Sequence, residues 1–242
     1  MKLNTNNYKY KELQKWYRRP VNNSIRKIMN DQIPKIKKHI AGNNVLFIGL
    51  SEFSKKFNSE KNLSFIAVDE ITSSDHIRES KKLPFEDNSH DVIIIIHALD
   101  YTENPYELVR EIDRIATDDA KVALMGFNRF SLWGTLKPFM NKLNPPWLLN
   151  FHSVYNVKEW FKILGYESSY QETACFTPVI SRNISKHLTK INFLQKILAR
   201  NFGGLYFFVF NKSIIPLTPV KLKFKEKMFL SSFPKSTMNL VK

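Results

Sequence analysis

Three apolar stretches decide the fold: VLFIGL at Val45–Leu50, FIAVDE at Phe65–Glu70 and LPFEDNSHDVIIIIHAL at Leu83–Leu99. Each contains a short apolar run bounded by polar turns, and spacers of helix length separate the runs. This pattern is typical of strands in a parallel sheet that helices cover on both faces. The sequence therefore predicts an α/β fold organised around residues 44–100.

The remaining apolar runs extend this pattern toward the carboxyl terminus. Further strands are predicted at Lys121–Phe127, Tyr166–Gln171 and Leu205–Asn211, the last of them antiparallel. Helical spacing of apolar residues predicts helices over Pro105–Ala116 and Val157–Leu164.

The amino-terminal region is predicted to be helical. Isoleucines recur at three- and four-residue steps from Val21 to Ile40, with Pro34 as a bend or restart and Ala41–Asn44 as the end of the helix. We expect residues 1–40 to form a helical cap. The main domain is expected over residues 41–226, with insertions at 128–152 and 176–204, followed by a disordered tail at 227–242.

The net charge of +15 is spread unevenly along the chain. Residues 1–40 carry +9, residues 41–175 carry −5, and residues 176–242 carry +11. Basic flanks can attract an anionic membrane surface or a nucleic acid, or they can simply solvate the protein. The basic, amphipathic pattern of residues 176–204 could contact lipid or a partner, or cap the sheet.

Cysteine content and hydropathy bear on the compartment. Cys175 is the single cysteine, so no internal disulfide can form, and the longest apolar runs are far shorter than the roughly 20 residues of a membrane-spanning helix. These features favour a cytoplasmic protein, with association at the membrane periphery as one possibility. The six histidines lack metal-ligand spacing, so no metal is expected.

Two residues at strand ends point to nucleoside binding. Gly49 ends the first strand, where ligands bind in open α/β sheets. Asp69 ends the next strand about 20 residues later, where a carboxylate can accept hydrogen bonds from ribose hydroxyls. Asp69 could equally be a helix cap or a solvated loop residue.

A longer motif resembles a known family. The run LPF-x-x-x-S-x-D-V, then an apolar strand, then P-x-x-L-x-x-E-x-x-R, spans Leu83 to Arg114. It is similar to the type 11 group of class I S-adenosylmethionine-dependent methyltransferases over roughly residues 42–172. GFNRFSLWG at Gly126–Gly134 and IPLTPVKLKF at Ile215–Phe224 resemble a narrower bacterial branch of that group, which has an irregular first motif.

The resemblance implies a seven-stranded, Rossmann-like sheet that is mostly parallel, and S-adenosylmethionine as the cofactor. It implies that the Gly49 turn holds the methionine end of the cofactor. It further implies that two acids hold the ribose and the adenine amino group, and that His97 lines the pocket near the sulfonium. The implied cofactor-binding residues are Gly49, Leu50, Ser51, Asp69, Glu79, Leu83 and His97.

The reaction class follows from these roles. A methyl acceptor that must lose a proton needs a base, and His97 and Tyr101 are the candidates, with Asp100 or Asn128 as orienting groups. The aromatic-rich residues 128–152 could wall a pocket for a small-molecule or lipid-like acceptor, or form a lid with its own core. The predicted function is methyl transfer to such an acceptor.

Two alternatives to methyl transfer to a small acceptor stay open. Relatives usually carry an aspartate at the position of Phe47 and glycines at the positions of Ser51 and Phe53, and the usual turn before the fifth strand is replaced by Asp118–Ala120. These departures favour a catalytically silent binding or scaffold protein. RNA methylation is compatible with the basic flanks.

Overall fold

The computed structural model describes residues 5–57, 64–68, 83–140, 142, 144–176 and 201–213. Within them a six-stranded sheet has the strand order β2-β1-β3-β4-β6-β5. The strands are β1 (Asn44–Gly49), β2 (Ser64–Val68), β3 (His90–Ile96), β4 (Ala116–Phe127), β5 (Tyr166–Ala174) and β6 (Leu205–Lys212).

The sheet is parallel from β2 to β4, and β6 runs antiparallel to both β4 and β5. The α/β class, the six strand positions and the antiparallel last strand are therefore confirmed. The seven-strand count is not confirmed, because the part of the chain that the structure describes holds six.

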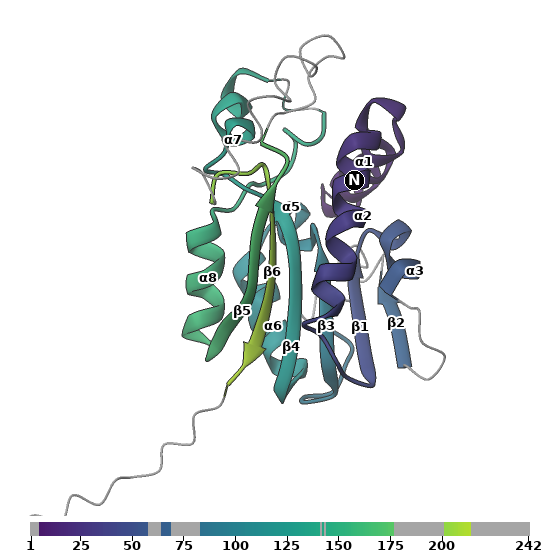
Figure 1. The fold of residues 1–242 in the computed structure, drawn as a ribbon, viewed down its shortest axis with the longest axis vertical. Coiled ribbons are helices and arrows are strands. Elements are labelled where there is room, and N and C mark those ends of the chain that lie inside the picture. Colours follow the sequence, from purple (N-terminus) through teal and green to yellow (C-terminus); the bar gives the residue numbers. More distant parts are fainter. Residues whose placement is uncertain are drawn as a thin grey trace, which may run out of the picture.

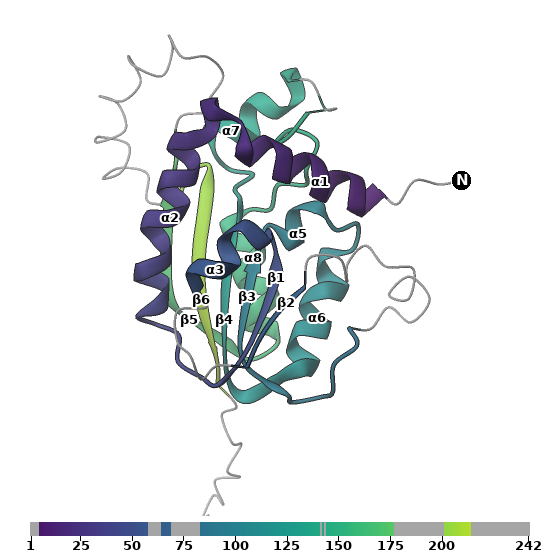
Figure 2. The ribbon, with the colours of Figure 1, turned by 90° about the vertical axis from the view of Figure 1, so that its right-hand side faces the viewer.

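Helices cover both faces of this sheet (Figures 1 and 2). On one face lie α2 (Asn23–Lys37) and α3 (Ser54–Phe57), and on the other lie α6 (Pro105–Ile115) and α8 (Val154–Ile163). Each long helix buries one apolar stripe against the strands, as its helical spacing predicts. The buried stripe of α6, for example, consists of Leu108, Val109, Ile112 and Ile115.

The carboxyl end of the parallel strands is covered by α1 and by several short helices. Helix α1 (Thr5–Arg18) crosses this end, as Figure 2 shows, and α7 (Leu132–Leu136) lies beside it. The remaining elements are η1 (Pro20–Asn22), η2 (Ser51–Phe53), α5 (Ala98–Tyr101) and η3 (Lys137–Phe139).

Two local predictions were wrong. Helix α2 runs through Pro34 without a restart and ends at Lys37, before the predicted Ala41–Asn44, and Gly42 instead packs against Asp91. The strand predicted to begin at Lys121 begins at Ala116, so residues 118–120, where relatives have a turn, belong to β4. The register between β3 and β4 shifts there, so a β-bulge absorbs the extra residues.

Other predictions lie outside the described residues. These are the tail at 227–242, Asp69, Glu79 and, except for residues 176 and 201–204, the insertion at 176–204. The proposed division of the chain into a cap and a main domain stays a prediction.

Candidate active site

The turn after β1 is built on a glycine that the sheet itself requires. Gly49 has a φ of +121° and pairs with Ile96 of β3. A Cβ at this position would lie 2.0 Å from the Ile96 carbonyl oxygen, so any other residue would push the two strands apart. The next residue, Leu50, is fully buried. Sheet packing alone therefore explains Gly49, and its predicted contact with a cofactor stays a prediction.

The short helix η2 places a carboxylate in this turn. The Ser54 hydroxyl donates to the Ser51 carbonyl at 2.7 Å and fixes the turn. Glu52 Oε1 is buried without a hydrogen-bond partner among the described residues, and Oε2 lies 3.9 Å from Arg18 Nε. Burial raises the pKa of Glu52, although Arg26 and Arg18 act in the opposite direction. Among the described residues nothing donates to this oxygen, so it is available to a hydrogen-bond donor from a ligand.

A buried hydrogen-bonded chain follows β3. His97 Nδ1 lies 2.7 Å from Asp100 Oδ2, and His97 Nε2 lies 2.6 Å from the Tyr17 hydroxyl oxygen. The histidine and aspartate side chains are fully buried, and so is Tyr17. We call these three residues the His97 chain. It joins α1 to the carboxyl end of β3 across 80 positions of sequence.

The hydrogen positions in this chain follow from the state of the phenol. Burial raises the pKa of Tyr17, and nearby Asp100 raises it further, so the hydroxyl keeps its proton. We therefore assign the phenol as the donor to His97 Nε2 and Nδ1–H as the donor to the Asp100 carboxylate. This arrangement orients the imidazole with Nε2 toward a hydroxyl group, as in enzymes that pair a nucleophilic hydroxyl with a histidine.

The backbone at His97 is strained. Its φ of 59° is left-handed, which is uncommon for a residue with a side chain. The surrounding structure holds it: the His97 amide donates to Met125 O at 2.9 Å, and its carbonyl accepts from the Asp100 amide at 2.9 Å. Strain of this kind is concentrated at functional sites.

Two unpartnered polar atoms lie beside the His97 chain. Asp100 Oδ2 also accepts from the Phe127 amide at 3.0 Å, but Asp100 Oδ1 and the Tyr206 hydroxyl are buried with no hydrogen-bond partner in the described part of the chain. Both lie next to Gly126, where a Cβ would be 3.1 Å from Oδ1 and 2.3 Å from the hydroxyl. Burial, and then Asp100, raise the pKa of Tyr206.

Aromatic rings exclude water from this region. The Phe127 ring lies 4.5 Å from the His97 ring, and Phe151 stacks on Phe127 at 5.1 Å. Residues 128–152 were predicted to wall a pocket or to form a lid. Trp133 and Trp147 of this segment are buried and pack together at 5.9 Å, and Trp133 also packs on Phe127 at 5.9 Å, so the segment is continuous with the main core.

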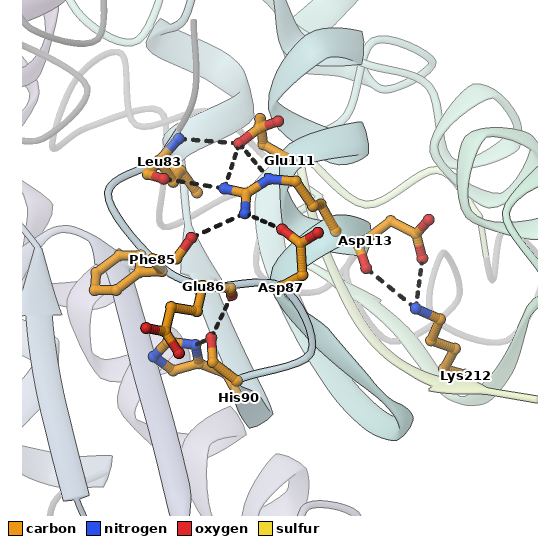
Figure 3. Close-up of polar contacts among 10 residues, drawn as sticks. Leu83, Phe85, Glu86, Asp87, His90, Glu111, Asp113 and Lys212 are labelled. Atoms are coloured by element: carbon orange, nitrogen blue, oxygen red, sulfur yellow. Dashed lines mark hydrogen bonds and ion pairs between the residues drawn. The ribbon is translucent and has the colours of Figure 1, made fainter. Parts of the chain in front are cut away.

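The family motif around Leu83 has a structural explanation (Figure 3). Arg114 donates to the carbonyls of Leu83 and Phe85 and to the carboxylates of Asp87 and Glu111, and Glu111 in turn accepts from the Leu83 amide. We call this set of contacts the Arg114 clamp. It fixes the loop that leads into β3. Leu83 is buried, and its predicted contact with adenine stays a prediction.

The phenol that contacts the imidazole had no predicted role: it is Tyr17 of α1. Tyr101, one of the two candidate bases, is buried, and its ring packs edge-on against Tyr10 at 5.7 Å. Its role as a base stays a prediction. Glu52 and Tyr206 were also missed. Their positions next to Gly49 and in the apolar last strand gave only a weak indication.

Two general findings complete the description of the site. Among the described residues, no group of three His, Cys, Asp or Glu side chains could hold a metal ion. Within the same residues, no helix has the length and apolar character needed to cross a bilayer.

Comparison with known proteins identifies the domain type. Residues 51–124 match a family described as a methyltransferase domain, and this confirms the resemblance to the type 11 group. Among curated proteins, the chain is 29% identical over 141 residues to the uncharacterized protein YafS of Escherichia coli K12. That match covers 56% of this chain and 54% of YafS, so it spans about half of that relative.

Solved structures show the same fold. An S-adenosylmethionine-dependent methyltransferase from Archaeoglobus fulgidus superposes with a TM-score of 0.53 at 19% identity, over 77% of this chain and 94% of that one. The [4+2]-cyclase SpnF superposes with a TM-score of 0.50 at 13% identity, over 76% and 80%. At these identities the similarity establishes the fold alone.

Proposed function

We propose that this chain, which has the fold of class I S-adenosylmethionine-dependent methyltransferases and matches their type 11 domain over residues 51–124, transfers a methyl group to a small-molecule or lipid-like acceptor. The observation that carries the proposal is the His97 chain at the carboxyl end of β3. That end is where open α/β sheets bind their ligands. A histidine activated by a carboxylate and facing a hydroxyl group is suited to remove a proton.

The residues of the β1 turn fit the cofactor. The unpartnered Glu52 Oε1 can accept a hydrogen bond from the ammonium group at the methionine end. The rings of Tyr17 and Phe53 are buried and pack edge-on at 5.4 Å, so they would attract a sulfonium cation only if the two rings moved apart. Asp69 and Glu79 would hold the ribose and the adenine. When bound, S-adenosylmethionine supplies an electrophilic methyl group.

The His97 chain would manage the proton of the acceptor. The Tyr17 oxygen takes the proton from the acceptor's O–H or N–H group as its own proton passes to His97 Nε2. The resulting imidazolium is stabilised by Asp100 Oδ2 at 2.7 Å. Neither ring is exposed, and Tyr17 belongs to α1, so an acceptor has to enter beside α1 while the contact between Tyr17 and His97 is kept.

One observation favours a second function. Phe53, at a position where relatives have glycine, is buried and packs against Tyr17. A bulky ring there could fill the space of the cofactor's tail. The protein would then be a catalytically silent binding module. The same fold in a [4+2]-cyclase shows that this architecture is not restricted to methyl transfer.

Calorimetric titration with S-adenosylmethionine and S-adenosylhomocysteine separates the two functions. We expect saturable one-to-one binding, and about tenfold weaker binding for Glu52→Gln because the ammonium loses a charged partner. Glu159→Gln removes a half-buried carboxylate on α8 and is the matched control. Asp69→Ala should weaken binding at least as much as Glu52→Gln.

The absence of heat and of a thermal shift at millimolar ligand would favour the silent module. Unchanged affinity in Glu52→Gln would remove Glu52 from the site without removing the cofactor. If binding is established, a screen of acceptors with methyl-labelled cofactor follows, and RNA belongs in that screen because of the basic flanks.

A further inference from the structure

A cavity beside the His97 chain is lined by cations. Its volume is about 470 Å³, and it lies between α7, η3 and the loop that follows them. The lining residues are Arg129, Gly134, Lys137, Pro138, Lys142, Asn150, Phe151 and His152. Three of these carry a positive charge, and no carboxylate is among them.

A second cavity shows that this charge pattern is not a general property of the surface. A cavity of about 570 Å³ between α8 and β5 is lined by Lys158 and Lys162 together with Glu159 and Glu167. Its cations and acids are equal in number. The cavity near η3 therefore differs from it in charge more than in size.

The cations around the η3 cavity lack acidic partners. Arg129 and Lys142 are exposed, and neither has an ion pair in the part of the chain that the structure describes. Lys137 is half-buried. Its ammonium donates to the Leu149 carbonyl and lies 4.8 Å above the Phe151 ring, which fixes its position.

The pKa of Lys137 also reflects this excess of positive charge around the cavity. Burial lowers the pKa of Lys137, and the neighbouring charges of Lys9, Arg129 and Lys142 lower it further. Asp100 is the one acid that acts in the opposite direction. The side chains from α1, from the end of β4 and from η3 thus create a positive field that an anion would relieve.

The cavity adjoins the proposed active site. The Asn150 amide donates to the Asp100 carbonyl at 2.7 Å. Phe151 stacks on Phe127, which in turn packs on His97. A ligand anchored in the cavity is therefore separated from the His97 chain by two stacked rings, those of Phe151 and Phe127.

We propose that the η3 cavity binds a phosphate group, with Arg129 and Lys142 as its charged ligands and Lys137 as a fixed cation behind them. Guanidinium groups bind phosphate through two parallel hydrogen bonds, and lysine adds a point charge. In a methyltransferase this phosphate belongs to the acceptor, an assignment that rests on the proposed function. The source can be a soluble phosphate ester or a lipid headgroup.

The test uses the full chain without S-adenosylmethionine. Phenyl phosphate is titrated and binding is followed by calorimetry at low salt, with benzoate as the carboxylate control. We expect binding of phenyl phosphate, and a loss of about tenfold in affinity for both Arg129→Gln and Lys142→Gln. Lys162→Gln, at the α8 cavity, should bind like the unaltered protein.

A second arm distinguishes the two sources. Vesicles of phosphatidylglycerol are compared with vesicles of phosphatidylcholine in sedimentation. Binding of phosphatidylglycerol vesicles that requires Arg129 and Lys142, and is weakened by Phe139→Ser at an 85% exposed residue, identifies a lipid headgroup. Binding of phenyl phosphate without vesicle binding identifies a soluble ester.

Three results would overturn the site: no binding of either probe, equal binding of benzoate, or an equal loss in Lys162→Gln. A different result would overturn the proposed function while leaving the phosphate site in place. A chain that binds phenyl phosphate through Arg129 and Lys142 but does not bind S-adenosylmethionine keeps this site and loses the methyltransferase assignment.

Discussion

The two ends of β3 carry polar clusters of similar size that differ in how completely they are paired. At the amino end, the Arg114 clamp uses its guanidinium on two carboxylates and two carbonyls. At the carboxyl end, the His97 chain leaves Asp100 Oδ1 and the nearby Tyr206 hydroxyl without partners among the described residues, and His97 itself is strained. At the amino end of β3, the paired polar groups stabilise the fold. At the carboxyl end, unpaired polar atoms are available to a ligand.

Removal of Arg114 should give the largest effect on stability. Arg114→Ala leaves the Leu83 and Phe85 carbonyls without their donor and removes the cation from Glu111, which keeps only the Leu83 amide. We expect the free energy of unfolding to fall by about 2 to 3 kcal/mol, because several partly buried acceptors lose a charged donor at once. Urea unfolding followed by circular dichroism measures it.

Arg110→Ala is the control, because Arg110 is exposed on the same helix. Its change should stay within about 0.5 kcal/mol. Equal changes for the two variants would mean that the Arg114 clamp is a surface feature, and the contrast between the two ends of β3 would disappear.

A substitution in the His97 chain should change the rate of methyl transfer more than the free energy of unfolding. Tyr17→Phe keeps the ring and removes the hydroxyl that contacts His97. We expect the rate of methyl transfer at saturation to fall about a hundredfold, as for the loss of a group in acid–base catalysis, while cofactor affinity stays within about twofold. The assay uses labelled cofactor and the acceptor found by screening.

Tyr8→Phe, at an exposed tyrosine of the same helix, should leave the rate unchanged. If Tyr17→Phe is also fully active, the His97 chain is structural, and the carboxyl end of β3 resembles the amino end after all.

The sequence could predict the strands but not the side chains that complete the site. Apolar runs such as Val45–Leu50 locate strands because burial on both faces leaves a continuous pattern. Tyr17 could not be found in this way, because its contact with His97 depends on how α1 crosses the end of the sheet. The early start of β4 was also missed: Asp118 and Asp119 favour turns locally, and they lie in the register shift between the pairs His90–Ala116 and Val92–Lys121.

Gly49 illustrates the limit of motif reasoning. A glycine at the end of the first strand was expected to admit a cofactor, but the close approach of the Ile96 carbonyl already requires it. The LPF and E-x-x-R motif carried the family resemblance in the sequence. In the structure its residues form the Arg114 clamp, so the motif has a structural role.

A third polar cluster, around Glu172, tests whether a fully hydrogen-bonded carboxylate stabilises the fold. Glu172 of β5 accepts from Gln32 at 2.9 Å and Lys35 at 2.8 Å on α2, and from Tyr170 at 2.6 Å. Burial acts to raise the pKa of Glu172, but the hydrogen bonds from Lys35, Tyr170 and Gln32 outweigh it and lower the pKa. A lowered pKa means that the ionised carboxylate stabilises the fold.

The sign of the pH dependence follows. The contribution of Glu172 is complete above its ordinary pKa near 4.5 and is lost as the pH falls through the lowered value. Glu172→Gln should therefore be less stable than the unaltered protein by about 1 kcal/mol at pH 7, and the difference should shrink below about pH 4. Glu167→Gln, exposed on the same strand, is the control. A difference that does not vary with pH would mean that charge plays no part in this cluster.

The smallest expected effect provides the most direct test of the contrast between the two ends of β3. Tyr206→Phe removes a buried hydroxyl that has no partner among the described residues, so no hydrogen bond is lost. We expect a change in the free energy of unfolding below about 0.5 kcal/mol, or a small gain, because an unsatisfied polar group costs energy when it is buried.

Tyr17→Phe should cost more in the same urea experiment, about 1 to 2 kcal/mol, because it leaves His97 Nε2 buried without its donor. If Tyr206→Phe costs as much as Tyr17→Phe, the Tyr206 hydroxyl is paired in solution, directly or through water, and Asp100 Oδ1, the other unpartnered atom beside Gly126, is the candidate acceptor. The carboxyl end of β3 would then be as fully satisfied as the Arg114 clamp. In that case the strain at His97 would be the one local feature left to distinguish the site from the rest of the sheet.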